Sequence, residues 1–135
     1  MWWMRATFLH ERSIDLAIAT WAAVNIDCAD PKMLGEFYRD LAGLPLHEQE
    51  GFYYLGDDDG LMIFLQQVDG YVAPTWPTQE RGQQMHLDFR VDDLDQAVAE
   101  AEKLGATVAP EQPGTFWKVL LDPEGHPFCL AQTQQ

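Results

Sequence analysis

The chain has 135 residues, enough for one ordinary domain that buries its core without disulfides or structural zinc. Its 22 acidic residues outnumber its 8 lysines and arginines and give a formal charge of −14 at pH 7. A surface this acidic repels phosphate backbones and anionic lipid headgroups, so we expect neither nucleic acid nor membrane as a partner. The same electrostatic field attracts cationic small molecules, but acidic surfaces also occur simply because they keep proteins soluble, which is the interpretation we favour.

The N-terminal segment and the two cysteines bear on where the protein works. Charged residues interrupt the apolar patches of residues 1–23, and no long uncharged core is present, so we expect neither a signal peptide nor a transmembrane span. Cys28 and Cys129 lie in separate strand-like runs without a CxxC or zinc-type spacing. A reducing, cytoplasmic setting is therefore the expectation.

Two copies of one pattern occupy most of the chain, "AVNIDCADPKMLGEFYRDLAGLPL" and "HLDFRVDDLDQAVAEAEKLGATVA". Each copy opens with alternating apolar residues, which is typical of a half-buried strand. Each then reaches an aspartate suited to cap a helix, and the helical apolar spacing that follows ends at a glycine. The capping and terminating residues are Asp30 and Gly43 in the first copy, and Asp93 and Gly105 in the second.

Three short extended runs follow each predicted helix, separated by turn residues. The runs are 46–49, 52–56 and 61–68 in the first copy, and 107–110, 116–121 and 127–132 in the second. The pattern predicts two βαβββ modules that together make one domain. We assign an N-terminal extension to 1–18, the first module to 19–67, a loop linker to 68–83 and the second module to 84–135.

The duplicated order resembles the vicinal oxygen chelate superfamily, which includes glyoxalase I, extradiol dioxygenases, fosfomycin-resistance enzymes and bleomycin-binding immunity proteins. The resemblance rests on "CADPKMLGEFYRDLAGLPL", "HLDFRVDDLDQAVAEAEKLGA" and "LLDPEGHPFCL", and the linker "PTWP" is similar to the glyoxalase-like branch. It implies an α+β fold in which two tandem βαβββ modules form a curled mixed sheet around a cleft, with the helices outside. It also implies a homodimer, in which the segment with Trp2, Trp3 and Phe8 adds a strand or covers an interface.

Metal-dependent members of the superfamily place four ligands in the cleft, one from the first and one from the fourth strand of each module. The matching positions here are Ala23, Gln66, His86 and Cys129. Ala23 has no donor atom, Gln66 offers only a neutral oxygen, and Cys129 stands where the family pattern has a glutamate. Catalytic metal sites usually have about three protein ligands, often imidazoles and carboxylates. His86 and Cys129 would be only two ligands, from distant strands, and would hold an ion weakly, so we expect no metal cofactor. The alternative is a divalent ion bound by His86 and Gln66.

Strand alternation places a set of polar residues on the face opposite the helices. These are His86, Asp88 and Arg90 in the second module, and Asn25 and Asp27 in the first. Histidine titrates near neutrality and a nearby carboxylate raises its pKa, so His86 and Asp88 are the acid/base pair if the protein is an enzyme. Hydrogen bonds and ion pairs between strands are the other interpretation, which we favour.

Aromatic residues border the same cleft and suit planar or cationic ligands. The candidates are Tyr53, Tyr54, Phe64, Phe116, Trp76 and Trp117, although about half of those on each strand must face the helix instead. Trp76 lies between two prolines of the linker, so it either meets the ligand or folds back as a hydrophobic cover over the adjacent module.

Two residues of the last strand region have expected structural roles. Cys129 points into the cleft if Phe128 and Leu130 face the helix, and without a neighbouring cation it is expected to be an inert filler rather than a reactive thiol. His126, in the turn "DPEGHP", is expected to stabilise that turn by hydrogen bonding.

Two functions remain open at this point. In the favoured one, the cleft binds a small planar or cationic organic molecule without the superfamily's full metal site. The alternative is a lyase or isomerase that uses His86 with a residual divalent metal, or His86 and Asp88 as acid and base. The expected ligand-binding residues are Asn25, Asp27, Tyr53, Phe64, Gln66, Trp76, Arg90, Trp117 and Cys129.

Overall fold

Each module begins with a strand in which alternate apolar residues face the core, buried in the first module and partly buried in the second. In β1 (Val24–Cys28), Ile26 and Cys28 are buried, and in β5 (Leu87–Val91), Phe89 packs edge-on against another aromatic ring of the core. The computed structural model describes residues 18–19, 21–57 and 60–133. The expected N-terminal extension, with its three aromatic residues, lies outside these ranges apart from residue 18.

The two helices begin and end at the predicted residues. The backbone N–H of Met33 in α2 (Pro31–Ala42) donates to the Asp30 carboxylate at 3.1 Å, and Gln96 N–H in α3 (Leu94–Leu104) donates to Asp93 at 3.1 Å. Gly43 and Gly105 end the helices with φ angles of 69° and 116°, in the left-handed region that favours glycine. Neither of the described helices has both the length and the apolar character that crossing a membrane requires.

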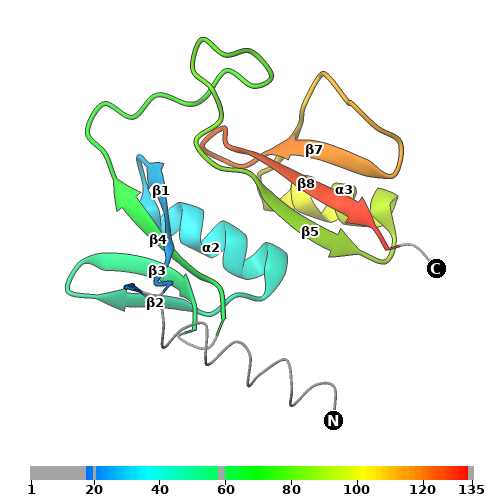
Figure 1. The fold of residues 1–135 in the computed structure, drawn as a ribbon. Helices are drawn as coiled ribbons and strands as arrows, with labels where there is room; N and C mark the ends of the chain where they lie inside the picture. Colours follow the sequence, from blue (N-terminus) through cyan, green and yellow to red (C-terminus); the bar gives the residue numbers. More distant parts are fainter. Residues whose placement is uncertain (1–17, 20, 58–59, 134–135) are drawn as a thin grey trace.

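The remaining strands complete one four-stranded mixed sheet in each module (Figure 1). The first sheet has the order β1-β4-β3-β2 and the second β5-β8-β7-β6, and in each the opening strand pairs in parallel with the last. This confirms the α+β fold of two βαβββ modules, and within the described ranges the two sheets do not close into a barrel. The strands are β2 (Leu46–Gln49), β3 (Phe52–Gly56), β4 (Met62–Gln67), β6 (Thr107–Val108), β7 (Trp117–Leu121) and β8 (Pro127–Gln132).

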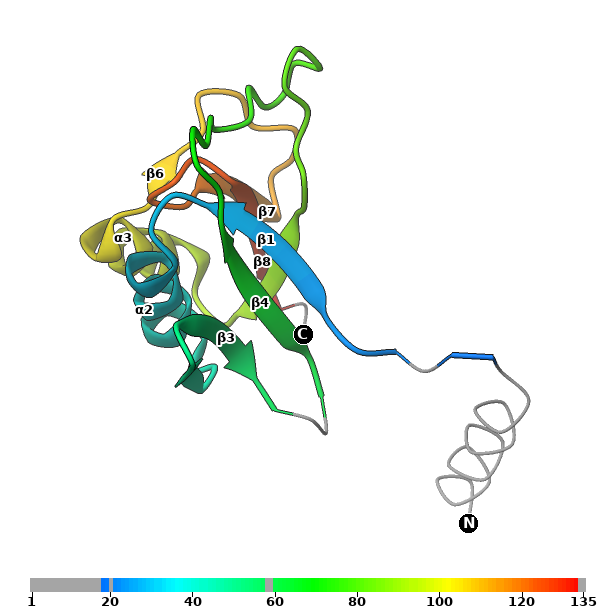
Figure 2. The same ribbon diagram turned by 90° about the vertical axis from the view of Figure 1, so that its left-hand side faces the viewer.

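One hydrophobic core is shared by both modules. It lies on the helix-facing side of the sheets and combines buried residues of β1, α2, β3 and β4 with those of α3, β7 and β8. Phe37 and Tyr38 of α2 pack edge-on against Phe128 of β8, with ring centroids 5.8 and 6.1 Å apart. Figure 2 shows α2 and α3 together on one side of the molecule. Neither of these two helices covers the opposite face of the sheets, which we call the inner face of each sheet.

A buried polar network joins the two modules. The Asp122 carboxylate, just after β7, accepts hydrogen bonds from Tyr38 Oη of α2 at 2.7 Å and from His126 Nδ1 at 2.8 Å. The other ring nitrogen of His126, Nε2, lies 2.7 Å from the backbone oxygen of Asp27 in β1. Burial lowers the pKa of His126, but the hydrogen bond to Asp122 and its negative charge outweigh burial and raise that pKa above its usual value. His126 thus has a structural role that reaches beyond its own turn to the junction between the modules.

Candidate functional site

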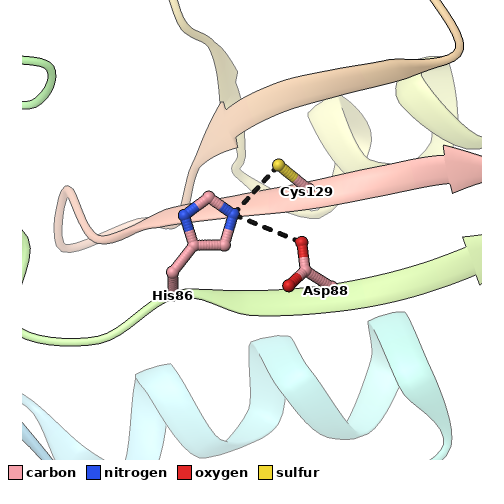
Figure 3. A group of neighbouring side chains, drawn as sticks. All are labelled: His86, Asp88 and Cys129. Carbon is pink, nitrogen blue, oxygen red and sulfur yellow. Dashed lines mark hydrogen bonds and ion pairs between the residues drawn. The ribbon is translucent and has the colours of Figure 1, made fainter.

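Three reactive side chains meet on the inner face of the second sheet. Asp88 of β5 and Cys129 of β8 are register partners on neighbouring parallel strands, and His86 directly precedes β5. His86 Nε2 lies 2.9 Å from Cys129 Sγ and 3.4 Å from an oxygen of Asp88 (Figure 3). We call these residues the His-Asp-Cys cluster. The expectation that His86 and Cys129 occupy distant strands is wrong, because the first strand of the module pairs directly with its last.

The surroundings of the cluster set the protonation of its thiol. His86 Nδ1 lies 3.1 Å from Gln83 Oε1 and donates to it, so the lone pair of Nε2 faces the other two side chains. Burial, and then the charge of Asp88, raises the pKa of Cys129 to about 11. At neutral pH Cys129 is therefore a thiol that can donate to His86, and not a free nucleophilic thiolate. Phe128 and Leu130 face the core, as the inward placement of Cys129 requires.

A pocket of about 610 Å³ opens beside the cluster. Its floor is Ala131, which lies between Arg90 of β5 and Trp117 of β7 in the strand register. The small alanine between two large side chains leaves the hollow, and the 36 % exposed Trp117 forms one wall. A second hollow of about 410 Å³ shares these three residues and continues toward Phe116. The full lining of the first pocket is His86, Asp88, Phe89, Arg90, Trp117, Cys129 and Ala131.

The linker tryptophan covers one end of this site. Trp76 packs against a small cluster of buried residues, Ala109, Val119 and Cys129, on the inner side of the second sheet. It thus lies over the second module as the hydrophobic cover described above. Its side chain packs against the same cluster that contains Cys129, whereas the side chain of Asp88 is 74 % exposed.

The first sheet carries a separate row of side chains on its inner face. Strand register places Asn25, Phe64, Tyr54 and His47 next to one another across the four strands. The rings of Tyr54 and His47 stack at 4.8 Å, and those of Tyr54 and Phe64 lie 5.5 Å apart. His47 was not among the expected residues, and Tyr54 was named on a strand bordering the cleft but Tyr53 was chosen as the ligand-binding residue.

Tyr53 lies on the opposite face of the same sheet. Its register partner is the buried Leu65, and its ring packs against the shared core. The expectation that Tyr53 borders the cleft is not met, because neighbouring residues of a strand point to opposite faces and the buried Leu55 fixes which face is which. The signal was present in "FYYLG", where Tyr53 shares its face with Leu55 and Tyr54 does not.

The other expected residues of the first module lie away from the cluster. Asp27 and Gln66 are register partners on β1 and β4, and among the described residues only those of the second module line the pocket beside His86. One face of the first sheet therefore carries all four expected residues of this module, and none of them lines that pocket: Asn25, Asp27, Phe64 and Gln66.

The donor atoms of the His-Asp-Cys cluster all lie within 4.8 Å of one another. This differs from the ligand set that the superfamily resemblance implies, because Asp88 is not one of the four implied positions and Ala23 offers no donor atom. The chain's residues therefore do not fit the four-ligand site, although the local trio is a plausible donor set for a different ion.

A larger hollow, of about 910 Å³, lies between the ends of α2, α3 and β5. Its lining combines charged residues, among them Asp40, Asp93 and Lys103, with apolar residues such as Leu41 and Leu104. Among the described residues, neither a histidine nor a cysteine lines it. We place the candidate site at the smaller pocket because the reactive side chains converge there.

Comparison with known proteins agrees with this architecture. The family model of the glyoxalase-like domain matches residues 23–131. A search of curated proteins found no match. Several solved structures share the fold, at identities too low to transfer an activity.

Three of these structures illustrate how similar they are to this chain. A glyoxalase/bleomycin resistance protein/dioxygenase family enzyme from Burkholderia phytofirmans has a TM-score of 0.65 at 23 % identity, covering 86 % of this chain and all of that one. The fosfomycin resistance protein FosX from Mesorhizobium loti has a TM-score of 0.62 at 14 % identity, covering 87 % of this chain and 95 % of its own. A mutant of FosX from Listeria monocytogenes, in complex with Mn(II) and 1S,2S-dihydroxypropylphosphonic acid, has a TM-score of 0.64 at 17 % identity, covering 87 % and 93 %. By its matched domain and its two βαβββ modules, the chain belongs to the glyoxalase-like family of the vicinal oxygen chelate superfamily.

Proposed function

We propose that this protein binds a small planar or cationic organic molecule in the pocket on the inner face of the second sheet. The observation that carries the proposal is the convergence of Trp117, Arg90, Asp88 and His86 around one hollow. Its volume, about 610 Å³, lies within the range typical of small-molecule sites. An aromatic wall with a few polar groups is the usual composition of such a site.

The charges favour a cation over an anion. Asp88 presents an exposed carboxylate at the pocket, and the chain's formal charge of −14 raises the local concentration of cations. Trp117 can stack on a planar ring and gains further from a positive charge over its face. Arg90, on the other side of Ala131, supports the planar part by stacking and repels a cation placed directly on it.

Binding without turnover is supported by the protonated thiol and the incomplete superfamily ligand set. A thiol with a pKa of about 11 is a poor nucleophile at neutral pH. Ala23 cannot supply the ligand that its position has in metal-dependent superfamily members.

The test is a titration of chelator-treated protein with acridine orange, a planar cation. Trp117→Ala should weaken binding by roughly tenfold, the size of one aromatic or cation–π contact. Trp21→Ala is the matched control, since Trp21 is exposed and lines neither of the two neighbouring hollows. Recovery of the dye unchanged is expected, and equal affinities for all three proteins would reject the pocket as its site.

An enzyme is the second candidate, and the contact between His86 and Asp88 favours it. An imidazole 3.4 Å from a carboxylate can accept a proton from a bound substrate as a general base. A lyase or isomerase of this kind would transform a ligand in the pocket and lose that activity in His86→Gln. Fosfomycin is the first compound to assay, because fosfomycin resistance proteins share the fold. Loss of fosfomycin with the wild type but not with His86→Gln would support this candidate over simple binding.

A homodimer in a reducing compartment completes the proposal. Trp21, Phe52 and Phe116 are exposed aromatic residues, and such surfaces often pair with another copy. Both cysteines are free and buried, which suits a reducing environment. Light scattering should give twice the 15.4 kDa mass of one chain, and the monomer mass would remove the dimer from the proposal.

A further inference from the structure

The loop that precedes β7 lies against the indole of Trp117. A Cβ atom placed on Gly114 would lie 2.6 Å from Cε2 of that indole and closer still to Cζ2 and Cη2. Carbon atoms of separate residues normally approach no nearer than about 3.5 Å, so only a glycine fits between the loop backbone and the ring. Gly114 does not have a positive φ, so the ring, and not the backbone conformation, requires glycine here.

The side chain of Gln112 anchors this loop to the edge of β7. Its amide nitrogen donates to the backbone oxygens of Ala109 and Val119 at 2.9 and 2.8 Å, and its amide oxygen accepts from the Val119 N–H at 2.9 Å. At the other end of the loop, the backbone oxygen of Phe116 accepts a hydrogen bond from Gln132 N–H of β8 at 2.8 Å. Three residues separate these two anchors, so the loop cannot easily move away from the indole.

The Trp117 indole connects the loop to the ligand pocket. It lines both hollows on the inner face of the second sheet, whereas Gly114 lines neither. The atoms nearest Gly114 belong to the far end of the tryptophan side chain, which can rotate into the free space of the hollows that border it. A methyl group at residue 114 would therefore displace the ring by about 1 Å or more and narrow the room beside Ala131.

We propose that Gly114 is a positioning residue, which fixes the place of the Trp117 indole and thereby the width of the pocket. This role rests on the proposed function, because Trp117 is the aromatic wall of the same site. The backbones of β5 and β7 lie about 10 Å apart, two strand spacings across β8, so a wall displaced by about 1 Å takes a substantial part of the space between Trp117 and Arg90. Gly114 thus determines whether a fused ring system or only a single ring fits.

The first measurement tests the contact by NMR without any ligand. In the wild type, nuclear Overhauser effects should join the Gly114 Hα protons to Hζ2 and Hη2 of Trp117. Gly114→Ala should move the indole N–H signal of Trp117, whereas Gly60→Ala should leave it unchanged. Gly60 is the matched control, because no described atom lies within 4 Å of its Cβ position and its φ is not positive. Absence of the Overhauser effects, or an indole signal that Gly114→Ala leaves in place, would overturn the proposal.

Titrations then test the width of the pocket. Acridine orange, with three fused rings, should bind Gly114→Ala about fivefold more weakly than the wild type, whereas N-methylpyridinium, with one ring, should lose less than about twofold. A change that merely weakened the fold would lower both affinities together. In the Trp117→Ala background, Gly114→Ala should cause no further loss of acridine orange binding, because the glycine acts through the indole. Equal losses for the two cations, or a further loss in the double variant, would overturn the proposal.

The two measurements separate this proposal from the proposed function. Wild-type protein that shows the Overhauser contact but binds neither cation would reject the proposed function, and with it the claim about the width of the pocket. Protein that binds acridine orange through Trp117 but lacks the contact would reject only the role of Gly114.

Discussion

Replacing Asp122 by alanine should cost the protein a large part of its stability. The Asp122 carboxylate is buried and accepts hydrogen bonds from Tyr38 Oη and from the imidazole and backbone N–H of His126. Alanine leaves the phenol and the imidazole without that partner in the interior. Because these groups come from both modules, the change loosens the junction between them.

The magnitude follows from the number and kind of bonds lost. At a pH where His126 is protonated, it forms a buried ion pair with Asp122, and removing one partner of such a pair costs about 3–5 kcal/mol. The Tyr38 hydroxyl adds an unsatisfied buried donor worth about 1 kcal/mol or more. We expect a decrease of about 4 kcal/mol in the free energy of unfolding for Asp122→Ala, a large share of the roughly 5–15 kcal/mol of an ordinary domain.

Urea unfolding followed by circular dichroism measures this change. With a slope of about 2 kcal/mol per molar urea, the midpoint should fall by about 2 M. Asp92→Asn, on the surface, should shift it by no more than about 0.3 M. A shift below about 0.5 M for Asp122→Ala, at unchanged slope, would refute the reasoning that this network holds the modules together.

The same network makes stability depend on pH. The pKa of His126 is raised in the folded protein, so its contribution is fully present below the pKa of an unfolded histidine, about 6.5. That contribution is lost as the pH rises from there through the folded pKa. The stability difference between the wild type and His126→Gln should therefore shrink over this range, and a difference independent of pH would contradict the assignment.

Three further outcomes are expected. Burial raises the pKa of Cys28 to about 12 and that of Cys129 to about 11. In native, metal-free protein at pH 8, both thiols should therefore react with iodoacetamide at least about 100-fold more slowly than in urea. Comparable rates in the native and unfolded protein would contradict the burial of the thiols. Trp76→Ala should uncover Cys129 and speed its alkylation severalfold, as mass spectrometry of the labelled peptide can show, while the rate at Cys28 stays the same. Asp93→Ala should lower the unfolding free energy by about 1 kcal/mol in urea titrations, because Gln96 N–H loses its cap.

Much of the fold follows from local signals in the sequence. The helix limits depend on Asp30 and Gly43, and on Asp93 and Gly105, which act through contacts a few residues long. The strand runs were predicted to within two residues at each end, because turn residues and apolar alternation are also local. Because the pattern occurs twice, it also predicts that the strands of both sheets pair in the same order.

The site was predictable residue by residue but not as a group. Alternation correctly places His86, Asp88 and Arg90 on one face, since it depends only on the strand's own period of two. The contact between His86 and Cys129 depends on which strands are neighbours across 43 residues, and no local pattern carries that information. The cluster was therefore missed as a unit, although His86 and Asp88 were named as a pair and Cys129 was expected to point into the same cleft.

Other differences have equally specific causes. Tyr53 and Tyr54 are chemically the same, so only the face taken by Leu55 separates them. The hydrogen bond from His126 to the first module could not be predicted, because the turn sequence alone does not indicate that the turn lies against β1.

The central claim is that ligand binding takes place on the inner face of the second sheet. A titration of ¹⁵N-labelled, metal-free protein with acridine orange tests it by the backbone and indole signals that shift. We predict that the shifts concentrate at Asp88, Arg90 and Ala131 and at the Trp117 indole. Shifts concentrated instead at Leu41 and Leu104, in the larger hollow between the helices, would contradict it.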